Sequence, residues 1–394
     1  MSDIKPQAGL AGLAGLAGLS GSAGLAGLAG LAGLAGLSQS AGLAGLAGLG
    51  GGSASPIGSI TNRDGIVGTW TTPPASDTPI PLNMEDPENL DLLGAQVRGH
   101  LAEFELLSRI GFDKKGQNVH FWHLESAPVP GVNNPPTVTY QPLMRFRRPS
   151  EAQFRAQLDI IEQYADLRID RAEEITTQLA SPVPYMATIC YLNPDRTPWT
   201  LELLDLALRL AYCVEQRAKY ALACKRPNEY SAQIQPMIPT PLHGALPSGH
   251  STEAHIVATV MTRLLHASGV PNYQGAMWPT QFFRLAARIA INRTVAGVHF
   301  PADSAAGACL GMTLGQYLVA RASHETSYDA WYFNGPAFSG DFDWAAMFDP
   351  ATRQQQALAG GATSINAAGQ PLGANGRSPV LKYIWDKAVE EWQV

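Results

Sequence analysis

Charged residues and cysteines are both scarce in this chain of 394 residues. Asp, Glu, Lys and Arg together account for only 15% of the sequence, and the formal net charge is −6. No run of Lys or Arg is long enough to indicate nucleic acid or a polybasic membrane contact as a partner. Any anion that the protein binds is therefore expected to bind at a local site.

The four cysteines show none of the paired spacings that ligate metals. We interpret them as buried thiols and not as disulfides or metal ligands: Cys190, Cys213, Cys224 and Cys309. The first residues, MSDIKPQ, lack a compact basic region ahead of an apolar block, so no secretory signal is expected. A cytoplasmic location is the default prediction, which leaves export by another route open.

A glycine repeat fills the region after the short tail at 1–7. From Gly9 to Gly51 every third residue is glycine, with Gln39 as the one exception. This period favours polyproline II rods that pack closely along their glycine edges and expose a leucine edge for assembly. The tract at 8–52 is therefore predicted to hold a homo-oligomer together, with disorder and a membrane-associated helical hairpin as the alternatives.

The rest of the chain is predicted to be an all-α helical bundle. A linker and extended segment at 53–88 leads into a catalytic domain at 89–394, in which strand patterns are scarce. Apolar residues recur at helical spacing in six stretches. These stretches are 89–111, 149–180, 197–225, 251–269, 279–297 and 302–322.

Three short blocks in the second half of this domain combine basic residues with histidines. The first block has Lys219 and Arg226, seven residues apart and so predicted on nearly the same helix face, before Pro227. Either cation alone is most simply explained as a solvated residue near a helix end.

The second block, Pro247-Ser248-Gly249-His250, stands where the next helix is predicted to begin. A helix amino terminus presents unpaired amides, glycine allows close approach, and the Ser248 hydroxyl adds a donor. The third block has Arg293, His299 and Asp303, in which the aspartate is placed to orient the imidazole. Together the blocks supply what a tetrahedral oxyanion requires.

These three blocks resemble the signature of one superfamily. It joins type 2 phosphatidic acid phosphatases, bacterial acid phosphatases and vanadium-dependent haloperoxidases. The matching positions are Lys219, Arg226-Pro227, Pro247-Ser248-Gly249-His250, Arg293, His299 and Asp303. The resemblance covers roughly residues 200–310. It departs from the phosphatase pattern at Asn292, where that pattern has serine.

Residues 226–254 also resemble haloperoxidases outside the signature, and His243 matches a second histidine of the bromoperoxidase type. The resemblance implies a vanadate-dependent haloperoxidase that uses hydrogen peroxide to oxidise bromide or iodide and halogenates small organic substrates. His299 would coordinate vanadium, and Asp303 would orient the imidazole of His299. His250 and Lys219 would assist the peroxide chemistry. The vanadate oxygens would be held by Lys219, Arg226, Ser248, Gly249 and Arg293.

Two alternatives stay open. The same pocket fits phosphate, and a phosphatase would use His299 as the nucleophile and His250 as the acid that protonates the leaving alcohol. A structural protein with a vestigial pocket is the other alternative. His120, His123 and Glu125 in the segment HFWHLE lack a matching distant ligand and are interpreted as a core or strand segment.

Overall fold

The computed structural model describes residues 72, 74, 82–131 and 133–393. The tail at 1–7, the glycine repeat at 8–52 and most of the segment at 53–88 lie outside these residues. The predictions of polyproline II rods and of assembly through the repeat therefore stay predictions.

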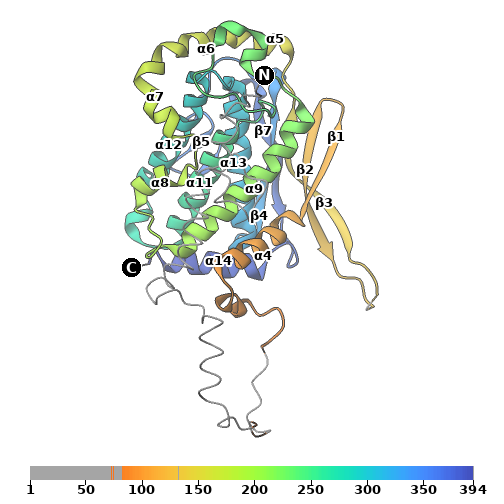
Figure 1. Cartoon of the computed structure of the whole chain (residues 1–394). Coiled ribbons are helices and arrows are strands. Elements are labelled where there is room, and N and C mark those ends of the chain that lie inside the picture. Colours follow the sequence, from red (N-terminus) through yellow and green to blue (C-terminus); the bar gives the residue numbers. More distant parts are fainter. Residues whose placement is uncertain (1–71, 73, 75–81, 132, 394) are drawn as a thin grey trace, which may run out of the picture.

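Four long helices form the centre of the molecule (Figure 1). They are α9 (Pro198–Leu222), α11 (Gly249–Ala267), α12 (Met277–Val295) and α13 (Pro301–Ala322). Each of the 22 residues of α13 is buried, and α11 is buried from Ser251 to Thr262. Helices that are apolar all round belong in the middle of a core, and the other elements cover these two.

Small residues at 305–311 let α13 lie close to α11. A methyl group added at Gly311 would lie 2.4 Å from the carbonyl oxygen of Thr252, and one at Gly307 would lie 2.5 Å from that of Ser248. Since these are backbone oxygens of α11 and of its N-cap residue Ser248, nothing larger than glycine fits without moving the backbone. This contact places the beginning of α11 against the first turns of α13.

The all-α prediction is wrong, because a five-stranded mixed sheet packs on one side of the bundle (Figure 1). The strand order is β1-β2-β3-β4-β7, with β3 and β4 parallel and the other neighbours antiparallel. The strands are β1 (Ile110–Lys115), β2 (Asn118–Ala127), β3 (Thr137–Arg147), β4 (Ser327–Asn334) and β7 (Thr363–Pro371). A second, two-stranded sheet joins β5 (Phe348–Asp349) to β6 (Gln354–Gln355).

The strands of the sheet show the alternating burial and the glycine turn that are typical of antiparallel strands. In β2 the buried side chains alternate, with Val119, Phe121 and His123 facing the core. Gly116, with φ +58°, makes the tight turn from β1 to β2. HFWHLE is thus part of a strand, as interpreted. The parallel pair, in which Met144 faces Trp331, joins segments that lie on either side of the whole helical region.

Two predicted helices are also shorter than expected. The stretch at 89–111 forms a 3-10 turn (Pro87–Leu92) and α4 (Ala95–Leu107), and then becomes β1. The stretch at 149–180 breaks into three helices that arch over one end of the bundle in Figure 1. These are α5 (Glu151–Ala156), α6 (Leu158–Tyr164) and α7 (Arg168–Thr177), and α8 (Val183–Cys190) follows them.

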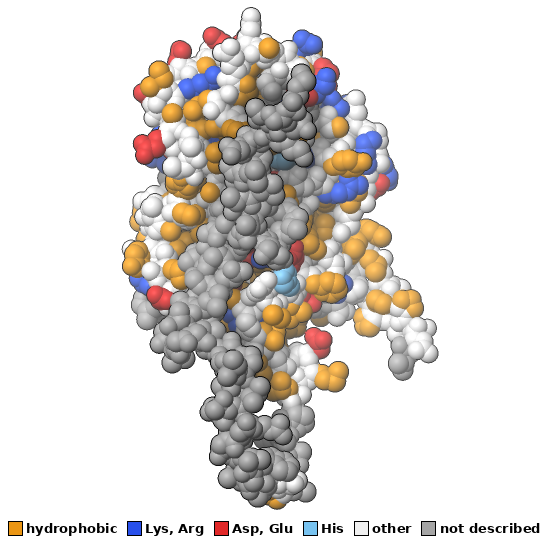
Figure 2. Space-filling view, viewed as in Figure 1, with side chains coloured by type: hydrophobic (Ala, Val, Ile, Leu, Met, Phe, Trp, Pro, Cys, Tyr) orange, Lys and Arg blue, Asp and Glu red, His pale blue; other side chains and the backbone are white. Residues whose placement is uncertain are grey.

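The last helix, α14 (Pro379–Glu390), docks on its own chain beside α9 and α4. Ile384 and Trp385 are buried there, whereas Val389 is only partly buried. Within the described part of the chain, no helix combines the length and the apolar character that crossing a membrane requires. On the face shown in Figure 2, hydrophobic side chains are mixed with charged ones, and Lys and Arg gather towards one edge.

Candidate active site

Lys219 and Arg226 do not share a helix face, which corrects the prediction from their spacing. Helix α9 ends at Leu222 because Ala223 adopts the left-handed conformation, with φ +49°. Arg226 then lies in extended backbone before the short α10 (Pro227–Tyr230). The break turns the Arg226 side chain back towards the end of α9, so both cations still reach one buried place: they are 1% and 2% exposed.

The Arg226 guanidinium connects two segments of the site. Its Nη1 donates to the carbonyl oxygen of Val298 at 2.8 Å and lies 2.9 Å from Nε2 of His299. Its Nη2 lies 3.1 Å from Nδ1 of His243. Because a guanidinium only donates, His299 Nε2 accepts from it. His243 Nδ1 lies near both this donor and, at 3.2 Å, the carbonyl oxygen of Gly244. Burial lowers the pKa of Arg226 to about 10, which leaves it charged at neutral pH.

His299 and Asp303 form a buried pair at the start of α13. His299 Nδ1 lies 3.0 Å from Asp303 Oδ2, which also accepts the Phe300 amide at 2.9 Å. Burial lowers the pKa of His299 well below its usual value, and the nearby charges of Arg226 and Lys219 act in the same direction. The imidazole is therefore neutral, with its proton on Nδ1 and the Nε2 lone pair facing the two cations.

Ser248 caps the beginning of α11 with its backbone and leaves its side chain free. Its amide donates to the carbonyl oxygen of Asp303 at 2.9 Å, which ties the start of α11 to the start of α13. The Ser248 hydroxyl is fully buried and has no hydrogen-bond partner among the described residues. Lys219 Nζ donates to the carbonyl oxygen of Pro247, next to Ser248. Gly249 is the first residue of α11.

Arg293, in the last turn of α12, is held from the side of α7. Its Nη2 donates to the carbonyl oxygen of Ile175 at 3.2 Å and to Gln178 Oε1 at 3.3 Å. Its Nε and Nη1 are buried without a partner in the described part of the chain. A buried guanidinium that leaves donors unused is costly, so these donors are suited to binding an anion.

The unused donors fit a tetrahedral oxyanion, either phosphate or vanadate. The Ser248 hydroxyl and two Arg293 nitrogens are available without any rearrangement of the described residues. Arg226 and Lys219 now donate to backbone carbonyls and to His299, and they add positive charge. The structure thus brings together the predicted residues of all three blocks, whose individual roles stay predictions.

A backbone contact fixes the orientation of His250. Its Nε2 lies 2.9 Å from the carbonyl oxygen of Gln178, so that nitrogen carries the proton and Nδ1 is the free acceptor. Burial and then the charge of Arg293 lower the pKa of His250 well below its usual value. Gln178 therefore contacts two predicted site residues, through its backbone and through its side chain.

Gln178 and the Asn292 that departs from the signature form one hydrogen-bonded unit. Asn292 Nδ2 donates to Gln178 Oε1 at 2.8 Å and to Glu174 Oε1 at 2.9 Å. Both amide side chains are buried. Sequence reasoning missed Gln178 because nothing in its neighbourhood marks it, and it treated Asn292 as a minor departure.

An open cleft of about 900 Å³ leads to this buried site from the solvent. Its walls include Lys219, Arg226 and His243 from the site, and Tyr220 and Leu242 at the surface. Burial, followed by the charges of Lys219 and Arg226, lowers the pKa of His243 to about 4, so His243 is neutral. The structure brings His243 into contact with Arg226, and the predicted role of His243 stays a prediction.

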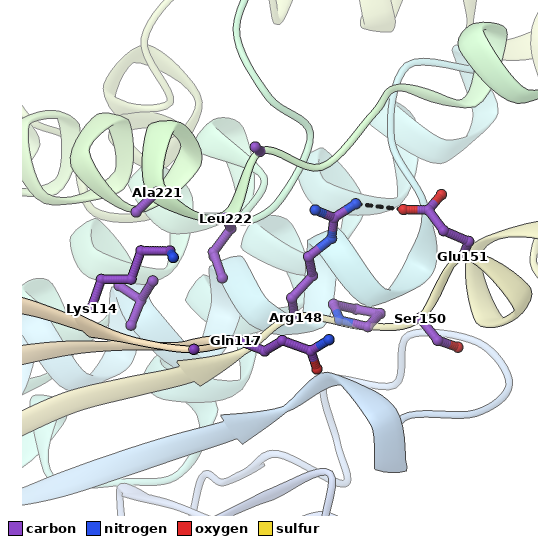
Figure 3. Close-up of a pocket in the computed structure, with 11 residues that line it drawn as sticks. Lys114, Gln117, Arg148, Ser150, Glu151, Ala221 and Leu222 are labelled. Atoms are coloured by element: carbon purple, nitrogen blue, oxygen red, sulfur yellow. Dashed lines mark hydrogen bonds and ion pairs between the residues drawn. The ribbon is translucent and has the colours of Figure 1, made fainter.

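A second cleft, of about 600 Å³, lies beside the carboxyl-terminal end of α9 (Figure 3). Lys114, Gln117, Arg148 and Leu222 are among the residues that line it. Its Arg148 is already engaged by Glu151, as the dashed line in Figure 3 shows. Because its lining includes no residue of the three blocks, it is separate from the oxyanion site.

One comparison with known proteins matches the part of the chain that holds the three blocks. Residues 202–326 match the family model of the PAP2 superfamily. Among solved structures, the chain resembles a transmembrane PAP2 type phosphatidylglycerolphosphate phosphatase from Bacillus subtilis, with 21% sequence identity and a TM-score of 0.35. That match covers 42% of this chain and 84% of the other. No curated protein matches. Residues 202–326 therefore form a domain of the PAP2 superfamily.

Proposed function

We propose that this protein is a phosphatase that hydrolyses phosphate monoesters through a phosphohistidine at His299. The observation that carries the proposal is the state of that imidazole. It is neutral, its Nδ1 proton is engaged by Asp303 at 3.0 Å, and its Nε2 lone pair faces the site cations. A nucleophile of this kind beside unused anion donors is what phosphoryl transfer requires.

The reaction divides into two steps. Binding of the anionic ester offsets the charge of Arg293 that lowers the pKa of His250, so His250 takes up a proton on Nδ1 when the ester binds. In the first step, His299 Nε2 attacks phosphorus, the bond from phosphorus to the ester oxygen breaks, and His250 gives this proton to the leaving alcohol. In the second, water attacks phosphorus, His250 takes a proton from that water, and the nitrogen–phosphorus bond breaks to release phosphate. His299 returns to its starting state.

The cations stabilise the charge on the phosphoryl oxygens in both steps. Arg293 Nε and Nη1 and the Ser248 hydroxyl are free to donate, and Arg226 exchanges its contact with His299 for one with the phosphoryl group. The leaving alcohol occupies the cleft, where Tyr220 is 83% exposed and Leu242 is fully exposed. These side chains favour esters whose alcohol has an apolar part.

Halide peroxidation with bound vanadate is a second candidate, favoured by the position of His243. That histidine contacts Arg226 at 3.1 Å and lies in the cleft, where it resembles the second histidine of bromoperoxidases. In this case His299 would coordinate vanadium, and Lys219, Arg226, Ser248, Gly249 and Arg293 would hold the oxygens. The vanadate would activate hydrogen peroxide for attack by bromide.

Two assays on the purified full chain separate these candidates. We expect hydrolysis of p-nitrophenyl phosphate that inorganic vanadate inhibits, and no bromination of a phenolic dye after vanadate loading with hydrogen peroxide. Bromination without ester hydrolysis would favour the haloperoxidase over the phosphatase. If neither activity appears, the pocket is vestigial and the proposal is wrong.

A further inference from the structure

Two buried glutamates lie beside the oxyanion site and have no role in the chemistry above. Glu215 stands four residues before Lys219 on α9, and Glu253 stands four residues after Gly249 on α11. Their exposures are 2% and 5%. Glu215 Oε2 is buried without a partner among the described residues, and Oε1 accepts only a long 3.3 Å bond from Gln216. Two ionised carboxylates in this environment would be expensive.

The geometry places both carboxyls at the beginning of α11. A methyl group at Gly249 would lie 2.7 Å from Glu215 Oε1 and 3.2 Å from Oε2, so this carboxyl packs directly against the Gly249 backbone. Glu253 projects from the same face of α11 one turn later and lines a small cavity with His250 and Tyr185. Gly249, which we assigned to oxyanion binding, therefore has a carboxyl as its neighbour.

The two carboxyls repel each other and resist ionisation. Burial raises the pKa of Glu215 to about 7. Burial and then the charge of Glu215 raise the pKa of Glu253 to about 8. The opposing influences are the positive charges of Lys219, Arg226 and Arg293. The ionisable groups around the pair come from six parts of the fold: Tyr212 and Lys219 of α9, Arg226, Tyr185 of α8, His250 of α11, Arg293 of α12 and Asp303 of α13.

We propose that at least one of the Glu215 and Glu253 carboxyls carries a proton at neutral pH, and that the two together take up a further proton when an oxyanion binds. This inference rests on the oxyanion site of the proposed function. An anion among Lys219, Arg226 and Arg293 cancels the positive charge that favours ionised carboxylates nearby. The protonated form of the pair then becomes the stable one, and by reciprocity protonation strengthens anion binding. Glu215 and Glu253 thus act as positioning residues that set the charge of the site.

Titration calorimetry with inorganic phosphate measures this uptake directly. The full chain is titrated at several pH values between 6 and 9, in buffers of different ionisation enthalpy, and the buffer dependence gives the number of protons taken up. The variants are Glu253→Gln and Glu215→Gln. The matched control is Glu391→Gln, which alters a half-buried carboxyl with a raised pKa at the opposite end of α9.

We expect the wild type and Glu391→Gln to take up more protons than either site variant near pH 8. Phosphate, Asp303 and the histidines contribute equally to all four proteins, so the difference belongs to the pair. Above pH 8 the dissociation constant of the wild type should rise relative to Glu253→Gln by up to about tenfold per pH unit. A purely structural role for the glutamates would not change proton uptake.

Infrared difference spectroscopy of the wild type provides a second test that needs no variant. Adding phosphate near pH 8 should produce a protonated-carboxyl band that shifts in heavy water. Phosphate binding without this band, or with the same proton uptake in all variants, would overturn the inference and leave the proposed function standing. If the wild type does not bind phosphate, the proposed function fails and the inference fails with it.

Discussion

Replacing Gln178 with alanine is a sharp test of how the site is supported. The side-chain amide of Gln178 accepts from Asn292 Nδ2 at 2.8 Å and from Arg293 Nη2 at 3.3 Å. The variant Gln178→Ala removes this acceptor and keeps the backbone carbonyl that holds His250. It should therefore loosen Arg293 without disturbing His250.

The magnitude follows from what each donor retains. Asn292 keeps Glu174 at 2.9 Å, and Arg293 keeps the Ile175 carbonyl at 3.2 Å, so neither donor is left entirely unpaired. A hydrogen bond to a charged group contributes about 1.5–3 kcal/mol, and the contact with Arg293 is long. We expect a loss of about 1–2 kcal/mol in transition-state binding, which is about 5- to 30-fold in kcat/KM.

Steady-state hydrolysis of p-nitrophenyl phosphate, combined with urea unfolding, measures both effects. The control is Gln355→Ala, which truncates another buried glutamine whose amide contacts Cys309 Sγ at 3.3 Å, within the core. It should lower stability and leave kcat/KM within about twofold. A third variant, Gln178→Glu, keeps the acceptor but adds a charge beside Arg293, so phosphate should bind more weakly although the protein folds.

Two results would refute this reasoning. One is an equal loss of kcat/KM in Gln178→Ala and Gln355→Ala, since the effect would then come from general destabilisation. The other is tighter phosphate binding by Gln178→Glu, since a carboxylate beside Arg293 competes with the anion in our account.

Three further predictions concern packing, charge and the site itself. Gly307→Ala places a methyl group 2.5 Å from the Ser248 carbonyl oxygen and should destabilise the protein by about 1–3 kcal/mol in urea unfolding, whereas Gly275→Ala, with nothing within 4 Å, should cost under about 0.5 kcal/mol. The raised pKa of Glu253 means that its folded form keeps a proton that the unfolded form releases above about pH 4.5, so stability falls as pH rises towards 8. Glu253→Gln should flatten that fall by at most about 1.4 kcal/mol per pH unit, and urea midpoints that stay parallel from pH 5 to 9 would contradict it. Arg226→Lys removes the fork that reaches Val298, His299 and His243, and kcat/KM should drop at least about a hundredfold; activity near that of the wild type would show that the fork is dispensable.

The sequence predicted the long helices well because their signals are local. Apolar spacing and a proline at the first helical position placed α9, and the structure has it at Pro198–Leu222. The three blocks could be recognised because each carries its chemistry within a few residues. Their convergence depends on the left-handed conformation of Ala223 and on the contact between Ser248 and Asp303. No local sequence pattern predicts either feature.

The sheet was missed because its pairing is not local. The strands β3 and β4 lie side by side although the whole helical region separates them in sequence. The sequence spacing of Glu215 and Glu253 could have predicted that they lie near the site. Each stands four residues from a signature position on a helix, which places it on the same face.

The central claim is that four basic or hydroxyl side chains, those of Lys219, Arg226, Ser248 and Arg293, hold one phosphoryl group for transfer to His299. The most direct measurement is to quench the enzyme with acid-free denaturant during turnover of a phosphorus-labelled ester and to map the label by peptide mass spectrometry. The account predicts a labile phosphoramidate on His299, present in the wild type and missing in His299→Ala. Turnover that leaves no label on His299, or that places it on another residue, would contradict the account.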